Sequence, residues 1–276
     1  MKRMILALVG AILIAAPLAA FAGPKHDREE LIHFFNSRYP NVKFNDYVYG
    51  SMAFNPDAKA QYESIMEFPP FTPVIEKGKK MWEKPFKNGK TFAGCFPNGG
   101  KNVAGDYPMF DNKLGKVVTF EMAINQCLKK NGEPQLSYRN MKTMGVLVSY
   151  ARTLSDGMKM NIKVNGPGAL AAYTRGKEFF YRRRGQLNFA CATCHVDNAG
   201  KRLRSQILST VVGQATHWPV FRGGTRLFTL QRRYVGCNKQ VRAVPFKPGS
   251  EVYNDLEYFE SYVSNGLPMH ASVFRP

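Results

Sequence analysis

Hydrophobic side chains recur at helical spacing in several stretches of the chain, with loops between them. Residues 27–38 place Leu31 and Phe35 on one apolar stripe, and Pro40 ends this pattern. The same spacing predicts further helices at 75–82, 119–129, 136–154, 169–184 and 253–263. Most of 41–108 is rich in glycine, proline and aromatic residues and reads as loop, as does the long stretch before the closing helix. The fold class that follows is mainly α.

A break in the helical pattern divides the chain into two parts. Residues 156–168 are rich in glycine and polar residues, end in Gly166-Pro167-Gly168 and read as a linker. A chain of 276 residues, of which 44% are hydrophobic, has enough material for two cores. We therefore expect one domain at 23–155 and a second at 169–276.

The first 22 residues have the composition of a secretory signal. Lys2 and Arg3 precede an apolar run, which closes with Ala20-Phe21-Ala22. The run is short for a membrane span, although an uncleaved anchor is the alternative. We expect a mature chain that starts near Gly23, has no stable membrane insertion and resides in the periplasm, where disulfides persist.

The chain is strongly basic, with a formal net charge of +19, and loss of the expected signal would remove only two of its cations. Nucleic acid is the usual partner of such a chain, but export argues against it. Acidic proteins, anionic substrates and a membrane surface remain as partners. A solvated basic surface explains the same composition.

The stretch Cys191-Ala-Thr-Cys194-His195 carries the clearest chemistry. In a C-x-x-C-H motif the two thiols form thioethers with haem vinyl groups, and the adjacent histidine binds the iron. The alternatives are a chance spacing, a thioredoxin-like redox pair and half of a zinc site. A redox pair would follow a strand, whereas Cys191 follows a helical, basic segment, and the sequence contains no second ligand pair at zinc spacing. The motif therefore predicts a c-type cytochrome.

The order of elements around the motif is that of cytochrome c: a helix, the motif, a loop-rich stretch and a closing helix. In that fold the first and last helices cross closely, which favours a small residue facing an aromatic one. Gly176, with Phe180, is placed to meet Tyr258, Phe259 or Tyr262. An ordinary amphipathic helix pair would use the same residues.

Cys95, Cys127 and Cys237 remain once the motif cysteines are assigned to haem, and three thiols cannot all pair. Cys95 and Cys127 both lie in the first expected domain, which favours a disulfide between them. Cys237 is then left over in the haem domain.

Cys237 precedes the closing helix, in the region where cytochromes c place their second iron ligand. A thiolate ligand would stabilise ferric iron and lower the reduction potential. Met269, in a Pro-Met pair, is an alternative ligand, but it follows the closing helix. His217 is a further alternative, better suited to a surface or haem-edge packing role beside Trp218. The order along the chain favours Cys237.

Three cationic residues, Arg232, Arg233 and Lys239, lie close to Cys237 in the sequence. Positive charge beside a thiol lowers its pKa and offers a docking place for a small dianion. Each of these three residues, considered alone, would ordinarily be interpreted as a charged residue on the protein surface.

Taken together, these motifs closely resemble the SoxA cytochromes, the catalytic subunits of thiosulfate-oxidising SoxAX complexes. The likeness extends over essentially the whole mature chain. It is carried by FNDYVYG at 44–50, NGKTFAGCF at 88–96, TFEMAINQC at 119–127, CATCH at 191–195 and RYVGC at 233–237.

The resemblance implies two fused cytochrome c-like domains with one covalently bound haem c. It implies His195 and Cys237 as the iron ligands, Cys237 as the catalytic sulfur that can carry a persulfide, and Arg233 as the substrate-binding residue. Some members carry a second haem motif in the first domain. Here Cys95 is followed by Phe96-Pro-Asn, so the chain is similar to the monohaem type, with a Cys95–Cys127 disulfide in place of that haem.

The reaction implied by the resemblance is the oxidative transfer of thiosulfate to a cysteine of a SoxYZ-like carrier protein. Forming the sulfur–sulfur bond releases two electrons, more than one haem accepts, so a second redox centre is needed. The resemblance supplies it as a SoxX-like monohaem cytochrome in a heterodimer. The alternatives from other classes are a plain electron-transfer cytochrome with His–Met ligation and a docking subunit whose haem is vestigial.

Overall fold

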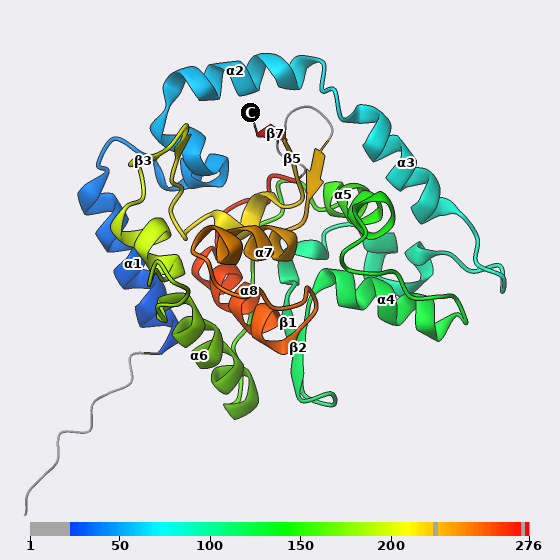
Figure 1. The fold of residues 1–276 in the computed structure, drawn as a ribbon. Coiled ribbons are helices and arrows are strands. Elements are labelled where there is room, and N and C mark those ends of the chain that lie inside the picture. The colour runs from blue at the N-terminus through cyan, green and yellow to red at the C-terminus, as the bar shows by residue number, and fades with distance from the viewer. Residues whose placement is uncertain (1–22, 223–225, 272–273, 276) are drawn as a thin grey trace, which may run out of the picture.

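The computed structural model describes residues 23–222, 226–271 and 274–275, so the expected signal at 1–22 lies outside the described residues. The fold is mainly α, as the sequence predicts. Figure 1 shows α8 near the centre, with α1 and α6 on one side of it and α3, α4 and α5 on the other. The α-helices are α1 (Pro24–Arg38), α2 (Pro56–Glu67), α3 (Thr72–Glu83), α4 (Phe120–Lys130), α5 (Val146–Thr153), α6 (Pro167–Tyr181), α7 (Leu230–Gln240) and α8 (Glu251–Val263).

Short strands and short helical segments connect these helices. Antiparallel pairs join β1 (Met109–Asp111) to β2 (Lys116–Val118), β3 (Arg202–Leu203) to β4 (Gln206–Ile207), and β5 (Val220–Arg222) to β6 (Arg226–Phe228), while β7 (Phe274–Arg275) runs parallel to β5. The short helices are η1 (Phe44–Phe54), η2 (Phe92–Cys95), η3 (Pro97–Gly100), η4 (Ala104–Asp106), η5 (Met141–Gly145), η6 (Thr193–Asp197) and η7 (Gln214–His217).

The crossing of α6 over α8 is close, as the sequence predicts. A Cβ atom at Gly176 would lie 2.0 Å from the carbonyl oxygen of Asp255, so only glycine allows this approach. Phe180 and Phe259 pack beside the crossing, with ring centroids 5.2 Å apart. The two backbones are therefore locked at one point, with aromatic side chains filling the space next to it.

The first half of the chain repeats this arrangement. A Cβ atom at Gly78 of α3 would lie 2.4 Å from the carbonyl oxygen of Val146 in α5. The helices α4 and α7 also match, because each begins after a threonine whose side chain accepts a hydrogen bond from the first turn: Thr119 from Met122 and Thr229 from Arg232. The order α3, η2, α4, α5 thus recurs as α6, the C-x-x-C-H turn, α7, α8.

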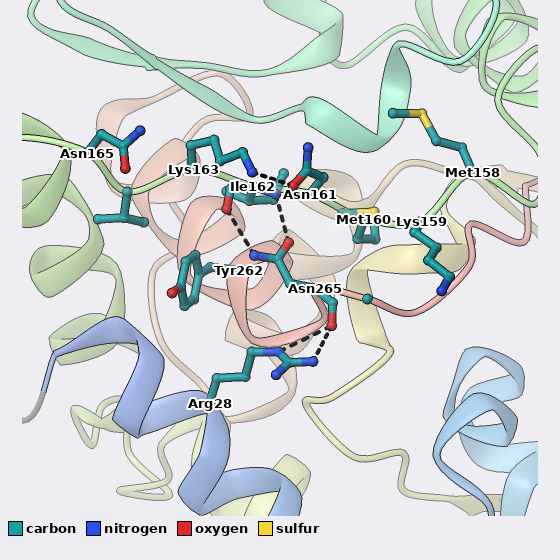
Figure 2. Close-up of a pocket in the computed structure, with 12 residues that line it drawn as sticks. Arg28, Met158, Lys159, Met160, Asn161, Ile162, Lys163, Asn165, Tyr262 and Asn265 are labelled. Carbon is teal, nitrogen blue, oxygen red and sulfur yellow. Dashed lines mark hydrogen bonds between the residues drawn. The ribbon is translucent and has the colours of Figure 1, made fainter.

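The segment expected to be a linker is extended and packed. Met160 and Ile162 within it are each 2% exposed. The backbone N–H of Met160 donates to Leu267 (2.9 Å), and that of Ile162 donates to the Asn265 side chain (2.7 Å; Figure 2). Arg28 of α1 donates through Nε to the Asn265 carbonyl oxygen (3.2 Å). Asn265, which lies just after α8, thus contacts both α1 and the extended segment. The domain limits expected at residues 155 and 169 stay predictions.

Six predicted helices are present, but the limits of one were wrong. The pattern at 136–154 predicted a single helix, whereas regular α-helix begins only at Val146 after the turn η5. The Asn125 side chain accepts from the backbone N–H of Leu136 (2.8 Å) and donates to its carbonyl oxygen (2.9 Å). The Leu136 carbonyl oxygen is thereby engaged by Asn125, whereas a helix that started there would need it to accept from the N–H four residues later.

Two helices were missed within the stretches read as loop. Helix α2 begins at Asn55-Pro56, where the Asn55 side chain accepts from Ala58 N–H (3.1 Å), a capping signal that the surrounding aromatic and glycine residues obscured. Helix α7 was missed because its exposed face is strongly basic. No helix in the described part of the chain is long and apolar enough to cross a membrane.

Buried acidic side chains connect the two halves. Glu257 of α8 accepts from the Gln231 side chain (2.9 Å) and interacts electrostatically with Glu121 and Arg152 of the first half. Burial raises the pKa of Glu257 to about 8, with a further rise from the Glu121 charge. This carboxyl group is therefore stabilised in its protonated form at neutral pH.

We predict that Gly176→Ala lowers the free energy of unfolding by about 1–3 kcal/mol or more, because the new methyl group must separate α6 from α8. Gly94→Ala is the control, since a Cβ atom there meets nothing within 4 Å. Denaturant unfolding of both variants measures the effect. Equal losses in the two variants would show that the crossing does not set the stability.

We predict that Glu257→Gln makes the protein less sensitive to rising pH. The folded-state pKa lies above the ordinary value of 4.5, so the protonated group's contribution to stability is complete below about pH 4.5 and is lost as the pH rises through about 8. The variant keeps an acceptor for Gln231 but has no charge to bury. Unfolding free energies at several pH values should show its advantage over wild type growing from pH 5 to 8, and Glu63→Gln, at an exposed site, should show none.

Candidate functional site

The C-x-x-C-H residues occupy a helical turn just after α6. The side-chain hydroxyl of Thr193 accepts a hydrogen bond from the backbone N–H of Ala190 (3.1 Å), which fixes the start of this turn. Helical spacing of three and four residues then places the Cys191 and Cys194 thiols and the His195 ring on one side. All three side chains retain partial solvent access.

His195 is held in one orientation. Its Nδ1 lies 2.9 Å from the carbonyl oxygen of Ser209, a contact that requires a proton on Nδ1. Burial lowers the pKa of His195 to about 4, so the ring is neutral at pH 7. A neutral ring with Nδ1–H engaged leaves the lone pair of Nε2 for a metal, which is the usual arrangement of a histidine ligand.

Helix α7, which carries Cys237, is fixed to α8 by buried hydrogen bonds. The Tyr234 hydroxyl donates to Glu260 (2.7 Å), and the Asn238 side chain donates to the Tyr253 hydroxyl (3.0 Å). Gln231, one turn earlier, donates to Glu257. Residues 231, 234 and 238 lie along one face of α7, so Cys237 is held on a rigid helix.

The three cationic residues that flank Cys237 in sequence separate onto different faces of α7. Arg233 lies one turn before Cys237 on the same side of the helix. Arg232 and Lys239 instead line a separate cavity of about 290 Å³ with Val235. The structure therefore brings only Arg233 of this group to the Cys237 side.

The electrostatic surroundings of Cys237 combine burial with positive charge. Burial raises the pKa of the Cys237 thiol, while Arg233 and then Arg222 lower it; the Glu260 carboxyl group raises it further. Arg222 and Glu260 were missed in the sequence. Arg222 is distant from Cys237 along the chain, and Glu260 lies on a helix whose polar residues would ordinarily face solvent.

Arg184 is another residue that the sequence did not single out. Its guanidinium lies 3.3 Å from the centre of the Phe179 ring and donates to the Asn238 side chain (3.2 Å). It also interacts electrostatically with Cys191 and opposes the rise in the pKa of that thiol caused by burial. Arg184 thus links the end of α6, the motif turn and α7.

The other sequence candidates have different surroundings. Cys95 and Cys127 form a disulfide with their Cα atoms 5.8 Å apart. Met269 is buried, and its backbone N–H donates to Met158 in the extended segment (2.7 Å). His217 is buried against Trp218, with ring centroids 5.5 Å apart, which is the packing role expected for it.

The donor chemistry fits a covalently bound haem. Two thiols on one side of a turn supply thioether bonds, and the adjacent neutral histidine supplies a nitrogen ligand. Cys237 interacts electrostatically with both Cys191 and Cys194, and His195 directly follows Cys194, so we assign the four side chains to one site. The cavity of about 630 Å³ lined by Arg28, Tyr262 and the extended segment contains none of them.

Comparison with known proteins supplies the family. A model of the SoxA/TsdA cytochrome c domain matches residues 77–160. The chain is 43% identical to the L-cysteine S-thiosulfotransferase subunit SoxA of Chlorobaculum tepidum over 264 residues. The aligned region covers 95% of this chain and 88% of the relative. The chain belongs to the SoxA family.

Further relatives agree with this assignment. The L-cysteine S-thiosulfotransferase subunit SoxA of Allochromatium vinosum is 40% identical over 268 residues, covering 96% of this chain and 94% of the relative. One chain in the crystal structure of SoxXA from P. pantotrophus is similar to this chain, with a TM-score of 0.68 and 31% sequence identity. The superposition covers 75% of this chain and 79% of that one. A SoxA cytochrome c domain implies haem c as the group that the motif residues fit.

Proposed function

We propose that this SoxA chain is an L-cysteine S-thiosulfotransferase subunit that joins thiosulfate oxidatively to a cysteine of a SoxYZ-like carrier protein. The observation that carries the proposal is the position of Cys237 and Arg233 on one side of α7, within the same site as the haem-attachment motif. The names of the relatives that span nearly the whole chain support it.

In this proposal Cys191 and Cys194 would attach one haem c, and His195 and Cys237 would bind its iron. The bound haem would supply an iron centre that accepts one electron at a time. The chain's own part is to hold His195 through Ser209 and to hold Cys237 through α7. Both side chains are thus held in place before any substrate arrives, Cys237 by the contacts of α7 with α8 and His195 by Ser209.

The reaction balances with the residues in these roles. A carrier thiol and thiosulfate give a carrier S-thiosulfonate, two electrons and one proton, with a new sulfur–sulfur bond. Arg233 binds the sulfonate oxygens and orients the outer sulfur, and the Cys237 sulfur, as thiol or persulfide, takes part in forming and breaking S–S bonds. The electrons pass to a SoxX-like cytochrome, which supplies the second redox centre.

We further propose that the chain is two fused cytochrome c-like units and that the first has no haem. The repeated crossings at Gly78 and Gly176 support this. Cys127 occupies the place in α4 that Cys237 occupies in α7, and Phe96 follows Cys95 where His195 follows Cys194. Aromatic rings fill the centre of the first unit: Trp82 stacks on Phe92 and Phe96 with ring centroids 5.3 and 5.5 Å away.

A surface near the motif suits the partner cytochrome. The hairpin 184–189 pairs with residues 241–242, because the backbone N–H groups of Gln186 and Leu187 donate to the carbonyl oxygens of Arg242 and Val241. Exposed apolar side chains gather along these segments and their continuation: Leu187, Phe189, Val244 and Phe246. Three exposed arginines, Arg182, Arg183 and Arg242, lie in or next to the same segments, so the surface offers apolar contact and positive charge to a SoxX-like partner. We place this assembly in the periplasm, reached through a cleaved signal at 1–22.

We predict that Cys237→Ser changes the haem itself as well as the activity. Loss of a thiolate ligand should remove the low-spin thiolate signal from low-temperature EPR and alter the optical spectrum of the oxidised protein. Turnover of thiosulfate with carrier, partner cytochrome and electron acceptor should fall to background. An unchanged spectrum would instead assign the protein to electron-transfer cytochromes with another ligand, such as Met269.

We predict that Arg233→Gln lowers kcat/KM for thiosulfate on the order of 10- to 100-fold, because a charge-assisted contact to the dianion is lost. Arg232→Gln is the matched control: it removes the same charge from the next residue, on another face of α7. Steady-state kinetics at constant ionic strength compares the two. Equal losses would show that the overall charge of α7, and no specific contact, is responsible.

A further inference from the structure

A second arginine lies beside the catalytic sulfur, from a different element. Arg222 is the last residue of β5, whereas Arg233 belongs to α7. Both guanidinium groups interact electrostatically with the Cys237 thiol, and they interact with each other. The two guanidinium groups therefore act on the same thiol, although ten residues of sequence separate them.

The sheet fixes the place of Arg222. Strand β5 pairs with β6 so that Arg222 lies opposite Arg226. Phe221 is fully buried and stacks on Phe71 with ring centroids 4.5 Å apart. Because neighbouring side chains of a strand point to opposite faces, burial of Phe221 directs Arg222 away from that core. Strand β6 continues through Thr229 into α7, so the sheet and the start of α7 form one continuous support.

The arginines of this region form no salt bridge among the described residues, although the Glu260 carboxyl group also interacts with the Cys237 thiol. Within the described ranges, the ion pairs involve neither Arg222, Arg226 nor Arg233. The hydrogen bond from Arg222 to the Gln206 side chain is long, at 3.4 Å. Arg222 is also half-buried, and burial together with the charges of Arg233 and Arg226 lowers its pKa. Like charges held together in this way favour the binding of an anion between them.

We propose that Arg222 and Arg233 form a two-arginine clamp that holds a doubly charged sulfur oxyanion beside Cys237. The inference rests on the proposed function and adds a second binding residue to it. Two planar guanidinium groups from different directions engage several oxygens of one sulfonate group, which leaves the outer sulfur directed toward Cys237. Arg232 and Lys239 do not share this role, because they line the separate cavity on another face of α7.

Kinetics of the haem-loaded complex tests the clamp. Arg222→Gln should raise the KM for thiosulfate at least about tenfold with a smaller change in kcat, because one charged contact to the ground-state anion is lost. Arg222→Lys should recover part of the affinity, since it restores the charge without the planar fork. Arg232→Gln should behave as wild type. The haem spectrum should stay unchanged in all three variants, which checks that the protein is folded and its iron ligands are intact.

A binding measurement separates the clamp from the reaction. Thiosulfate and sulfate should each raise the thermal midpoint of wild-type protein, and Arg222→Gln should lose most of this rise. An unchanged KM and an unchanged thermal rise in Arg222→Gln, with both altered in Arg233→Gln, would overturn the clamp and leave the proposed function intact. Wild-type protein that shows the anion-dependent rise but no thiosulfate turnover would overturn the proposed function while supporting an anion site at these arginines.

Discussion

The rest of the site depends on the close approach of α6 to α8 at Gly176. The C-x-x-C-H turn follows α6 after a connection, residues 182–190, in which Arg184 donates a hydrogen bond back to Phe179 of α6. The position of the turn therefore depends on that of α6. Helix α7, which carries Cys237 and Arg233, has its own position fixed by hydrogen bonds to α8. The histidine side and the cysteine side of the site are thus both positioned against the same helix, and a change in the α6–α8 distance would alter the gap between them.

The contacts between α7 and α8 are polar, although they lie in the interior. Apolar side chains would hold the two helices together, but they would tolerate rotation or sliding of one helix along the other. Directed hydrogen bonds from Gln231, Tyr234 and Asn238 allow only one register. The cost is two buried carboxyl groups, Glu257 and Glu260, whose pKa values burial raises to about 8. We interpret this cost as the consequence of holding Cys237 at one defined rotation.

The sequence predicted the helical class, six of the helices, the glycine at the α6–α8 crossing and the packing of His217 beside Trp218. These features depend on local pattern and on spacing. It did not predict α7, because a helix that carries Arg232, Arg233 and Lys239 has too few apolar positions to show a period. It also did not identify Arg222 or Glu260 at the site. Their proximity to Cys237 arises from the pairing of β5 with β6 and from the packing of α7 on α8, which no local spacing encodes.

Helix α8 differs from an ordinary amphipathic helix in how little of it faces solvent. Ten of its 13 residues are buried, and its sides contact α6, α7 and the first half of the chain. A helix of this kind has almost no surface on which substitutions accumulate without effect. Within the family, sequence change should therefore be slow along α8 and fast along α2, even though α8 supplies neither an iron ligand nor a substrate contact.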